Sequence, residues 1–172
     1  MFDLTLWIIA LEYLAVFAVA GWLLSIAIKN VSIVDSMWSL MFLIAACVYL
    51  FLGDIGPRAT LVALLTAVWS LRLAGYITWR NWGEGEDYRY QRIRRNNSPN
   101  FTFKSLYIVF GLQAGLAWII SLPLLAAITG TAPLGFLDAA GVILWMVGFT
   151  FETLGDLQLA QFKADPGNKG KV

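Results

Sequence analysis

The stretch NWGEGEDYRYQRIRRNNSPNFTFK, residues 81–104, separates two long apolar runs and sets the topology expected for the chain. Its basic residues, together with Arg80 at its entrance, are Arg89, Arg92, Arg94, Arg95 and Lys104. Loops that carry an excess of arginine and lysine face the cytoplasm in membrane proteins. We therefore predict a cytoplasmic loop, residues 81–102, between two membrane-spanning helices.

The composition indicates an integral membrane protein. Hydrophobic residues make up 59% of the 172-residue chain, charged residues make up only 13%, and the mean hydropathy is +0.71. A soluble domain is about half apolar and a quarter charged. A spanning helix needs about 20 mostly apolar residues, which predicts an all-α, polytopic fold with about five transmembrane helices. The predicted spans are 5–28, 32–52, 59–80, 103–129 and 136–162, in a single transmembrane domain that covers residues 1–172.

Alternation of the spans places the remaining connections. With the 81–102 loop cytoplasmic, the turn at Lys29 and the C-terminal tail beyond Lys163 are also cytoplasmic, and the N-terminus lies outside. The lysines then fall on the same side of the membrane as the arginines of the loop. The net charge of +1 gives no indication of nucleic-acid binding. The expected partners are therefore the lipid bilayer and a small molecule.

Histidine is absent from the sequence, and Cys47 is the single cysteine. An intrachain disulfide is therefore excluded, and so are zinc, di-iron and haem sites that depend on histidine. No metal site is predicted. Chemistry in this protein must use carboxylates, arginine, lysine, tyrosine and amide side chains, or a bound cofactor.

Ionisable side chains inside the second and third spans are candidates for function, because they are costly in a membrane. Asp35 lies near the start of the second span, and Trp38 shares its helix face. In the third span Arg72, Tyr76 and Arg80 follow at intervals of four residues and form one stripe. The alternative for Asp35 is helix capping or ion pairing. The alternative for Arg80 is contact of its long side chain with the membrane interface.

A narrow polar face marks the fifth span. At 100° per residue, Glu152, Asp156 and Lys163 lie at about 0°, 40° and 20° around the helix. Two carboxylates and a lysine on one stripe indicate a site for a ligand with ribose, amide or phosphate groups. A ring of helix-end charges is the alternative, and it explains Glu152 poorly, because Glu152 lies about 15 Å further into the helix. In the fourth span Gln113 is interpreted as forming an interhelical hydrogen bond.

The loop segment EDYRY, residues 86–90, alternates acidic, aromatic and basic side chains. Arginine suits phosphate groups, and tyrosine suits flat rings or carbonyl groups. Arg89 and Tyr90 are therefore candidates for ligand binding. Anchoring to lipid headgroups is the alternative interpretation of this segment.

Three motifs together resemble the bacterial uncharacterised branch of the steroid 5-alpha-reductase family. They are VDSMWS, RLAGYITWRNWGEGEDYRYQRIRR and FETLGDLQLAQFKADPGNKGKV, and the resemblance covers the chain in order. It implies a helical enzyme of the bacterial inner membrane, corresponding to the N-terminal part of a fold of roughly seven helices. Such enzymes use NADPH, bound at the cytoplasmic side, to reduce an activated carbon–carbon double bond in a steroid- or lipid-like substrate.

The resemblance also implies roles for residues that contact the cofactor. Glu152, Asp156 and Lys163 match positions that contact NADPH in the family, although Glu152 stands where the steroid reductases carry an asparagine. Arg80, Arg89 and Tyr90 match the cytoplasmic loop on the cofactor side.

On the substrate side, Asp35 matches the region of the acid that polarises the substrate carbonyl, and Tyr76 matches the region of its tyrosine partner. These two residues are the predicted catalytic pair. Trp38 and Arg72 are predicted to contact the substrate, because each shares a helix face with one member of that pair.

In the resembling family the segment KGKV is followed by a stretch such as GLWRYSRHPNYFGE that also contacts the cofactor. This chain is expected to lack that C-terminal motif, to bind NADPH weakly and to show low activity. Two alternatives remain for the function. One is a related membrane methyltransferase that uses S-adenosylmethionine, and the other is a non-catalytic membrane or lipid-binding protein.

Overall fold

The computed structural model describes residues 3–168, and the described part of the chain is helical, without strands. Five helices are long and apolar enough to cross a membrane: Leu4–Ile28, Ile33–Leu52, Ala59–Arg80, Phe101–Thr129 and Phe136–Ala164. These bounds lie within two residues of the predicted ones. The prediction of an all-α, five-span membrane protein is therefore confirmed.

The chain divides into two compact units, Met1–Ala132 and Pro133–Val172. The first contains α1 (Leu4–Ile28), α2 (Ile33–Leu52), α3 (Ala59–Arg80), α4 (Tyr88–Asn96) and the broken fourth span. The second contains α8 (Phe136–Ala164) and a short 3-10 turn, Pro166–Asn168. The prediction of one transmembrane domain over residues 1–172 stays a prediction.

The central helix of the first unit is α2, which packs against α1, α3, α6 and α7. Its buried face contributes Val34, Met37 and Met41 to the apolar core. Gly21 of α1 faces Met37, and a Cβ atom there would overlap the Met37 side chain. Glycine therefore allows α1 to approach α2 closely at this level.

Two tryptophans join α1 to the fourth span. The rings of Trp7 and Trp118 are stacked, with centroids 3.8 Å apart and planes 13° apart. Each indole also donates to the backbone carbonyl of the other residue, at 3.3 Å from Trp7 Nε1 and at 2.8 Å from Trp118 Nε1. The paired rings and reciprocal hydrogen bonds hold the two helices together far from the polar loop.

The fourth span is not one regular helix. It consists of α5 (Phe101–Ser105), a π-helical segment (Leu106–Gly111), α6 (Leu112–Ile120) and α7 (Leu122–Thr129). The break before α7 falls at Ser121, whose hydroxyl bonds to the Tyr49 hydroxyl at 2.7 Å. π-Helical turns are rare and are often found near functional sites, and this one directly precedes the turn of α6 that carries Gln113.

A further close approach lies at the other end of the first unit, where the α2–α3 turn meets the end of α7. Gly56 donates its N–H to the Ile128 carbonyl at 2.8 Å. A Cβ atom on Gly56 would overlap the backbone carbonyl of Gly130. Only glycine fits this contact between the two backbones.

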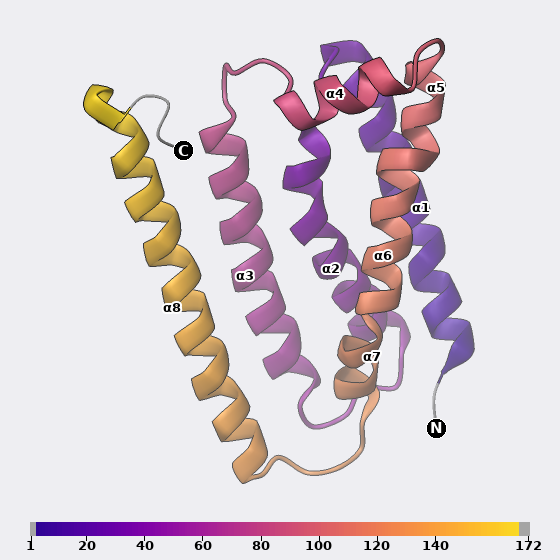
Figure 1. The fold of residues 1–172 in the computed structure, drawn as a ribbon. Coiled ribbons are helices and arrows are strands. Elements are labelled where there is room, and N and C mark those ends of the chain that lie inside the picture. The colour runs from indigo at the N-terminus through magenta and orange to yellow at the C-terminus, as the bar shows by residue number, and fades with distance from the viewer. Residues whose placement is uncertain (1–2, 169–172) are drawn as a thin grey trace. The chain divides into compact units, whose positions relative to one another are not determined.

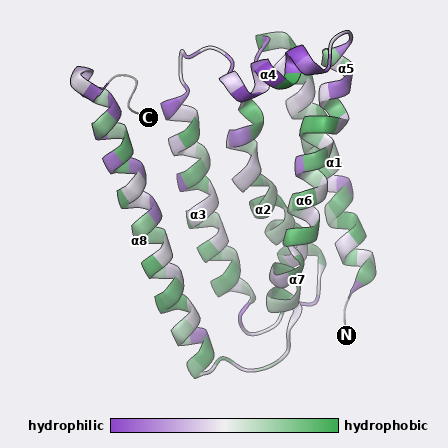
Figure 2. Cartoon of the chain, viewed as in Figure 1, coloured by the Kyte–Doolittle hydropathy of each residue, from purple (hydrophilic) through white to green (hydrophobic). Residues whose placement is uncertain are grey.

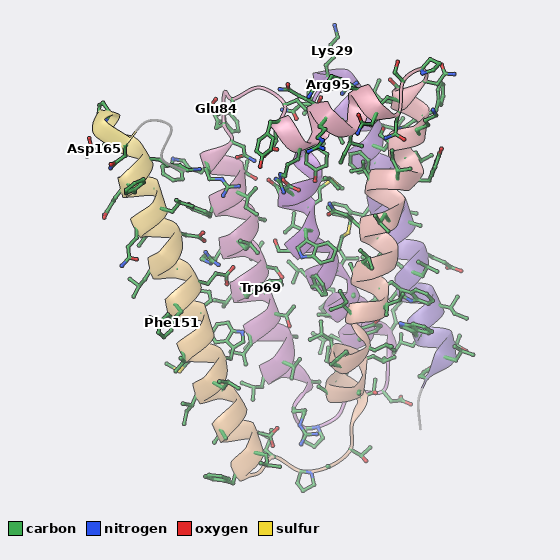
Figure 3. The ribbon with its side chains drawn as sticks, viewed as in Figure 1. Lys29, Trp69, Glu84, Arg95, Phe151 and Asp165 are labelled. Atoms are coloured by element: carbon green, nitrogen blue, oxygen red, sulfur yellow. The ribbon has the colours of Figure 1, made fainter. Side chains whose placement is uncertain are left out.

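The polar stretch 81–104 forms more than a loop, because it contains α4. Figure 1 shows α4 lying across the ends of the long helices of the first unit, and Figure 2 shows hydrophilic residues gathered on it. Lys29, Glu84 and Arg95 all lie at this end (Figure 3). We call it the polar end of the first unit.

Candidate functional site

An ion pair and a short hydrogen bond connect α2 to α4 at the polar end. Asp35, in the first turn of α2, is 17% exposed, and its Oδ2 accepts a hydrogen bond from Arg89 Nη2 at 2.7 Å. Its Oδ1 accepts a second hydrogen bond from the Tyr90 hydroxyl at 2.5 Å. A carboxylate with two such donors is held in a fixed orientation. We call these three residues the Asp35 network.

The sequence before α4 explains how Arg89 and Tyr90 reach Asp35 together. Asp87 caps the helix, because its Oδ1 accepts the Arg89 N–H at 2.8 Å, and it also accepts Arg89 Nε at 3.0 Å. The Arg89 side chain is thereby directed along the start of the helix. Tyr90 is only 6% exposed and belongs to the apolar core, so its ring is fixed by packing.

The start of α4 is tied to the turn between α1 and α2 by a second set of contacts, which we call the clasp. Glu86 Oε1 accepts the Val31 N–H at 3.0 Å, and the Asp87 N–H donates to Ser32 Oγ at 2.8 Å. Arg94 pairs with both oxygens of Glu86, at 2.9 and 2.7 Å. The clasp therefore positions α4 over the end of α2.

Burial and charge shift the pKa values of these groups. The Arg89 guanidinium lowers the pKa of the Asp87 carboxyl. Burial alone would raise the pKa of Glu86, but Arg94 and the Val31 N–H outweigh it and hold that pKa below its ordinary value. Burial, followed by the hydrogen bond to Asp35, raises the pKa of the Tyr90 phenol well above its ordinary value. Tyr90 is thus a neutral hydrogen-bond donor throughout the physiological range.

A cavity of about 500 Å³ lies beside the Asp35 network. Its lining combines charged, amide and apolar side chains, contributed by Asp35, Trp38, Ile77, Arg80, Arg89, Leu112, Gln113 and Leu116. Pockets of this size accommodate small molecules, which are oriented by a few polar groups on an apolar wall. The cavity therefore suits an amphiphilic ligand.

Gln113 is the residue whose importance for this cavity the sequence did not indicate. Its Nε2 lies 3.5 Å from the Tyr90 hydroxyl, and its Oε1 is buried without a hydrogen-bond partner among residues 3–168. Buried polar atoms almost always have a partner. A polar residue inside an apolar span was the available signal, and the interhelical hydrogen bond predicted for Gln113 is present, from α6 to Tyr90 of α4. The sequence did not indicate that Gln113 also lines a cavity.

Four of the predicted site residues line this one cavity, namely Asp35, Trp38, Arg80 and Arg89. Tyr90 joins them through its hydrogen bond to Asp35. The tyrosine that the structure pairs with Asp35 is thus Tyr90, which was predicted to lie on the cofactor side.

The other predicted residues lie on α3 and on α8. The ring of Tyr76 packs against Trp79, and the Arg80 guanidinium lies 5.7 Å from its centroid. Arg72 lies one turn earlier on α3. The roles predicted for both residues stay predictions.

Within the second unit, the residues predicted to contact the cofactor belong to one continuous helix, α8. Glu152, Asp156 and Lys163 therefore share one face of it, as their spacing predicted. Their contacts with a cofactor stay predictions.

The comparisons with known proteins identify a family but no characterised relative. The family model described as "Protein of unknown function (DUF1295)" matches residues 21–172. This range includes the Asp35 network, the cavity and α8. A search of curated proteins gave no match, and neither did a search of solved structures.

Proposed function

The chain belongs to the DUF1295 family of proteins of unknown function, and we propose that it is a membrane-embedded, NADPH-dependent reductase. Its substrate would be a steroid- or lipid-like molecule with an activated, enone-type carbon–carbon double bond. The observation that carries the proposal is the 500 Å³ cavity, in which the Asp35 network borders an apolar wall. The resemblance to the steroid 5-alpha-reductase family supports the choice of reaction.

Two motifs of that resemblance contribute to the same cavity. VDSMWS provides Asp35 and Trp38, and the longer motif that begins in α3 provides Arg80 and Arg89. The lining residues from the two motifs are far apart in the sequence, since Arg80 follows Trp38 by about 40 positions. Their convergence on one cavity supports a shared role in ligand binding.

The lining suggests how a lipid-like substrate would lie. Ile77, Leu112 and Leu116 provide an apolar surface, and Trp38 adds an aromatic ring. The Asp35 network provides the polar part of the lining. A substrate carbonyl would therefore face the network, and the hydrocarbon part would contact the apolar side chains.

The network is suited to stabilise the negative charge that develops on a carbonyl oxygen during reduction. Groups fixed in advance, in a site with little water, do this more effectively than solvent does. Arg89 is a fixed cation, and Tyr90 keeps its proton because its pKa is raised. We propose that the Arg89 guanidinium, which lines the cavity, stabilises the substrate oxygen, and that Asp35, held in place by the Tyr90 hydroxyl, positions Arg89.

NADPH, when bound, would supply a hydride to the beta carbon of the enone. Completing the reduction then requires one proton at the alpha carbon. In this proposal the proton comes from solvent, because the O–H proton of Tyr90 is already donated to Asp35. Apolar lining residues would limit the access of water during the transfer.

The residues present fit a phosphorylated cofactor. Arg80 Nε donates to Asn81 at 3.3 Å, and its two Nη groups make no hydrogen bond within the described part of the chain. A guanidinium with free N–H groups is a typical phosphate ligand. We propose that Arg80 holds a phosphate of NADPH, with Arg89 lining the same cavity. Glu152, Asp156 and Lys163 of α8 are the further cofactor contacts that the family resemblance implies.

NADPH binding tests this proposal. The purified chain in detergent is titrated with NADPH while its thermal unfolding is followed, in parallel with S-adenosylmethionine. We expect saturable stabilisation by NADPH alone. The affinity for NADPH should fall at least about tenfold in Arg80→Gln, since a lost charged contact costs more than 1.4 kcal/mol. It should also fall in a double variant, Asp156→Ala with Lys163→Ala.

Arg95→Gln is the matched control, because Arg95 is an exposed arginine of α4 that does not line the cavity. It should bind NADPH as the parent does. Stabilisation by S-adenosylmethionine in place of NADPH would favour the methyltransferase alternative. Because millimolar NADPH is enough to detect even the weak binding expected of this chain, no stabilisation at that concentration would overturn the reductase proposal.

A further inference from the structure

A second cavity, of about 530 Å³, lies between α1, α2 and α3 at the polar end. We propose that it binds a neutral single-chain amphiphile, with an uncharged hydroxyl-bearing headgroup and an apolar tail. The proposal does not depend on the reductase function, because the cavity shares no lining residue with the first one.

The separation of the two cavities follows from helix geometry. On α2 the first cavity is lined by Asp35 and the second by its neighbour Ser36. On α3 the corresponding neighbours are Ile77, which lines the first cavity, and Thr78, which lines the second. Adjacent residues of a helix point about 100° apart. The pair α2–α3 therefore presents one surface to each cavity.

The tail-binding part of the second cavity is a stripe along α1. Phe17, Ala20, Leu24 and Ile28 recur at intervals of three and four residues and face Met37 of α2. From Phe17 to Ile28 the stripe extends about 16 Å along the helix. A straight hydrocarbon chain fits a surface of this length, and the small side chain of Ala20 leaves room for it.

The headgroup part is rich in uncharged hydrogen-bonding groups. Ser36 lines the cavity, and its hydroxyl makes no hydrogen bond within residues 3–168. Ser32 Oγ accepts the Asp87 N–H, which leaves its own O–H to donate. Asn30 and Asn81 add amide groups. A glycerol-like headgroup can satisfy these hydroxyl and amide groups together.

Charge distinguishes this cavity from the first. Glu84 is the only ionisable residue among its lining residues, whereas Arg80 and Arg89 line the first cavity. A phosphate headgroup would meet no cation there and would be repelled by the Glu84 carboxylate. The second cavity therefore favours a neutral amphiphile over an anionic one.

The mouth of the cavity is formed by a loop that is fixed at both ends. Trp82, Gly83 and Glu84 lie directly after α3, and Gly83 has a φ of 80°, a conformation that favours glycine. Beyond them the chain is held by the clasp at Glu86. Trp82 is 81% exposed, as is typical of tryptophans at a membrane interface.

Native mass spectrometry of the full chain, released from detergent, tests the proposal with two probes that differ only in headgroup. Monooleoylglycerol is neutral, and oleoyl lysophosphatidic acid carries a phosphate. We expect saturable binding of one monooleoylglycerol, and binding of the phosphate probe weaker by about tenfold or more. Glu84→Lys should reverse this preference.

Ala20→Phe fills the cavity, and Ala15→Phe is the matched control, because Ala15 is an exposed residue of α1 outside the lining. We expect binding to weaken at least about tenfold in Ala20→Phe and to be unchanged in Ala15→Phe. Circular dichroism verifies that both variants are folded. Equal binding by Ala20→Phe and the parent would overturn the proposal, as would non-saturable uptake of both probes.

Photo-crosslinking of the unaltered chain gives an answer that depends on no variant. A monoacylglycerol with a diazirine in its tail is expected to label residues 17–37, with competition by unlabelled monooleoylglycerol. Labelling spread over all lipid-facing helices, without competition, would indicate ordinary bilayer contact and would contradict the proposed site.

Discussion

At the scale of single residues, the hydrogen bond between Tyr90 and Asp35 organises the polar end. It joins a buried phenol to a carboxylate that also holds an arginine. Without it, Oδ1 of the largely buried Asp35 carboxylate would lose its hydrogen-bond donor. Such a loss costs about 1–2 kcal/mol in typical cases.

We therefore expect Tyr90→Phe to lower the free energy of unfolding by about 1–2 kcal/mol. Tyr88→Phe is the matched control, because Tyr88 is 76% exposed on the same helix, and it should have almost no effect. Reversible unfolding in mixed detergent and denaturing micelles measures both changes. Equal effects of the two variants would show that the hydrogen bond does not stabilise the fold.

The clasp predicts how stability depends on pH. The pKa values of Glu86 and Asp87 are lowered in the folded protein, so both carboxyls contribute stability above their ordinary pKa values of about 4. That contribution is lost as the pH falls below about 4 and through the folded-state values. We expect the double variant Glu86→Gln, Asp87→Asn to be less stable than the parent at pH 7.

The difference in stability between parent and double variant should shrink as the pH approaches 3, because the parent carboxyls are then protonated. Unfolding measured at several pH values follows this convergence. A difference that is constant from pH 7 to pH 3 would mean that the charges of the clasp contribute nothing.

The sequence identified most of these residues but not how they pair. A charged side chain in an apolar span stands out, which is why Asp35 was predicted to be functional. The sequence predicted Tyr76 as its partner, whereas the structure pairs it with Tyr90. That pairing depends on where α4 lies, which the clasp determines. A contact between residues 55 positions apart cannot be derived from local spacing.

At the scale of elements, the spans were predictable and the irregular segments were not. Hydropathy summed over about 20 residues gives a strong signal for each span. The π-helical segment Leu106–Gly111 and the break at Ser121 depend on side-chain contacts of single turns. Helix α4 is short and charged, so no apolar periodicity marked it.

The contact between the α2–α3 turn and the end of α7 gives an element-scale prediction. Because a Cβ atom on Gly56 would overlap the Gly130 carbonyl, we expect Gly56→Ala to destabilise the protein by about 1–3 kcal/mol. Gly115→Ala in α6 meets no atom within 4 Å and should be neutral or slightly stabilising. Unfolding of the two variants under the same conditions compares them directly. Similar destabilisation by both would argue against the close backbone contact.

At the scale of the whole molecule, the distribution of charge predicts the orientation in the membrane. The polar end carries the arginines of α4, so we expect it to face the cytoplasm. In a Cys47→Ser chain, Asp54→Cys at the opposite end should react with an impermeant maleimide in intact cells. Arg92→Cys on α4 should react only after permeabilisation. The reverse pattern would contradict the predicted orientation.

The stacked tryptophans of α1 and α6 have an optical consequence. Two nearly parallel indole rings 3.8 Å apart couple their electronic transitions, which produces a paired positive and negative band in circular dichroism. The band pair exists only while α1 is docked on the fourth span, so its amplitude reports assembly of the first unit without any added label. Trp118→Phe would abolish it, and following it during refolding would show when the first and fourth spans come together.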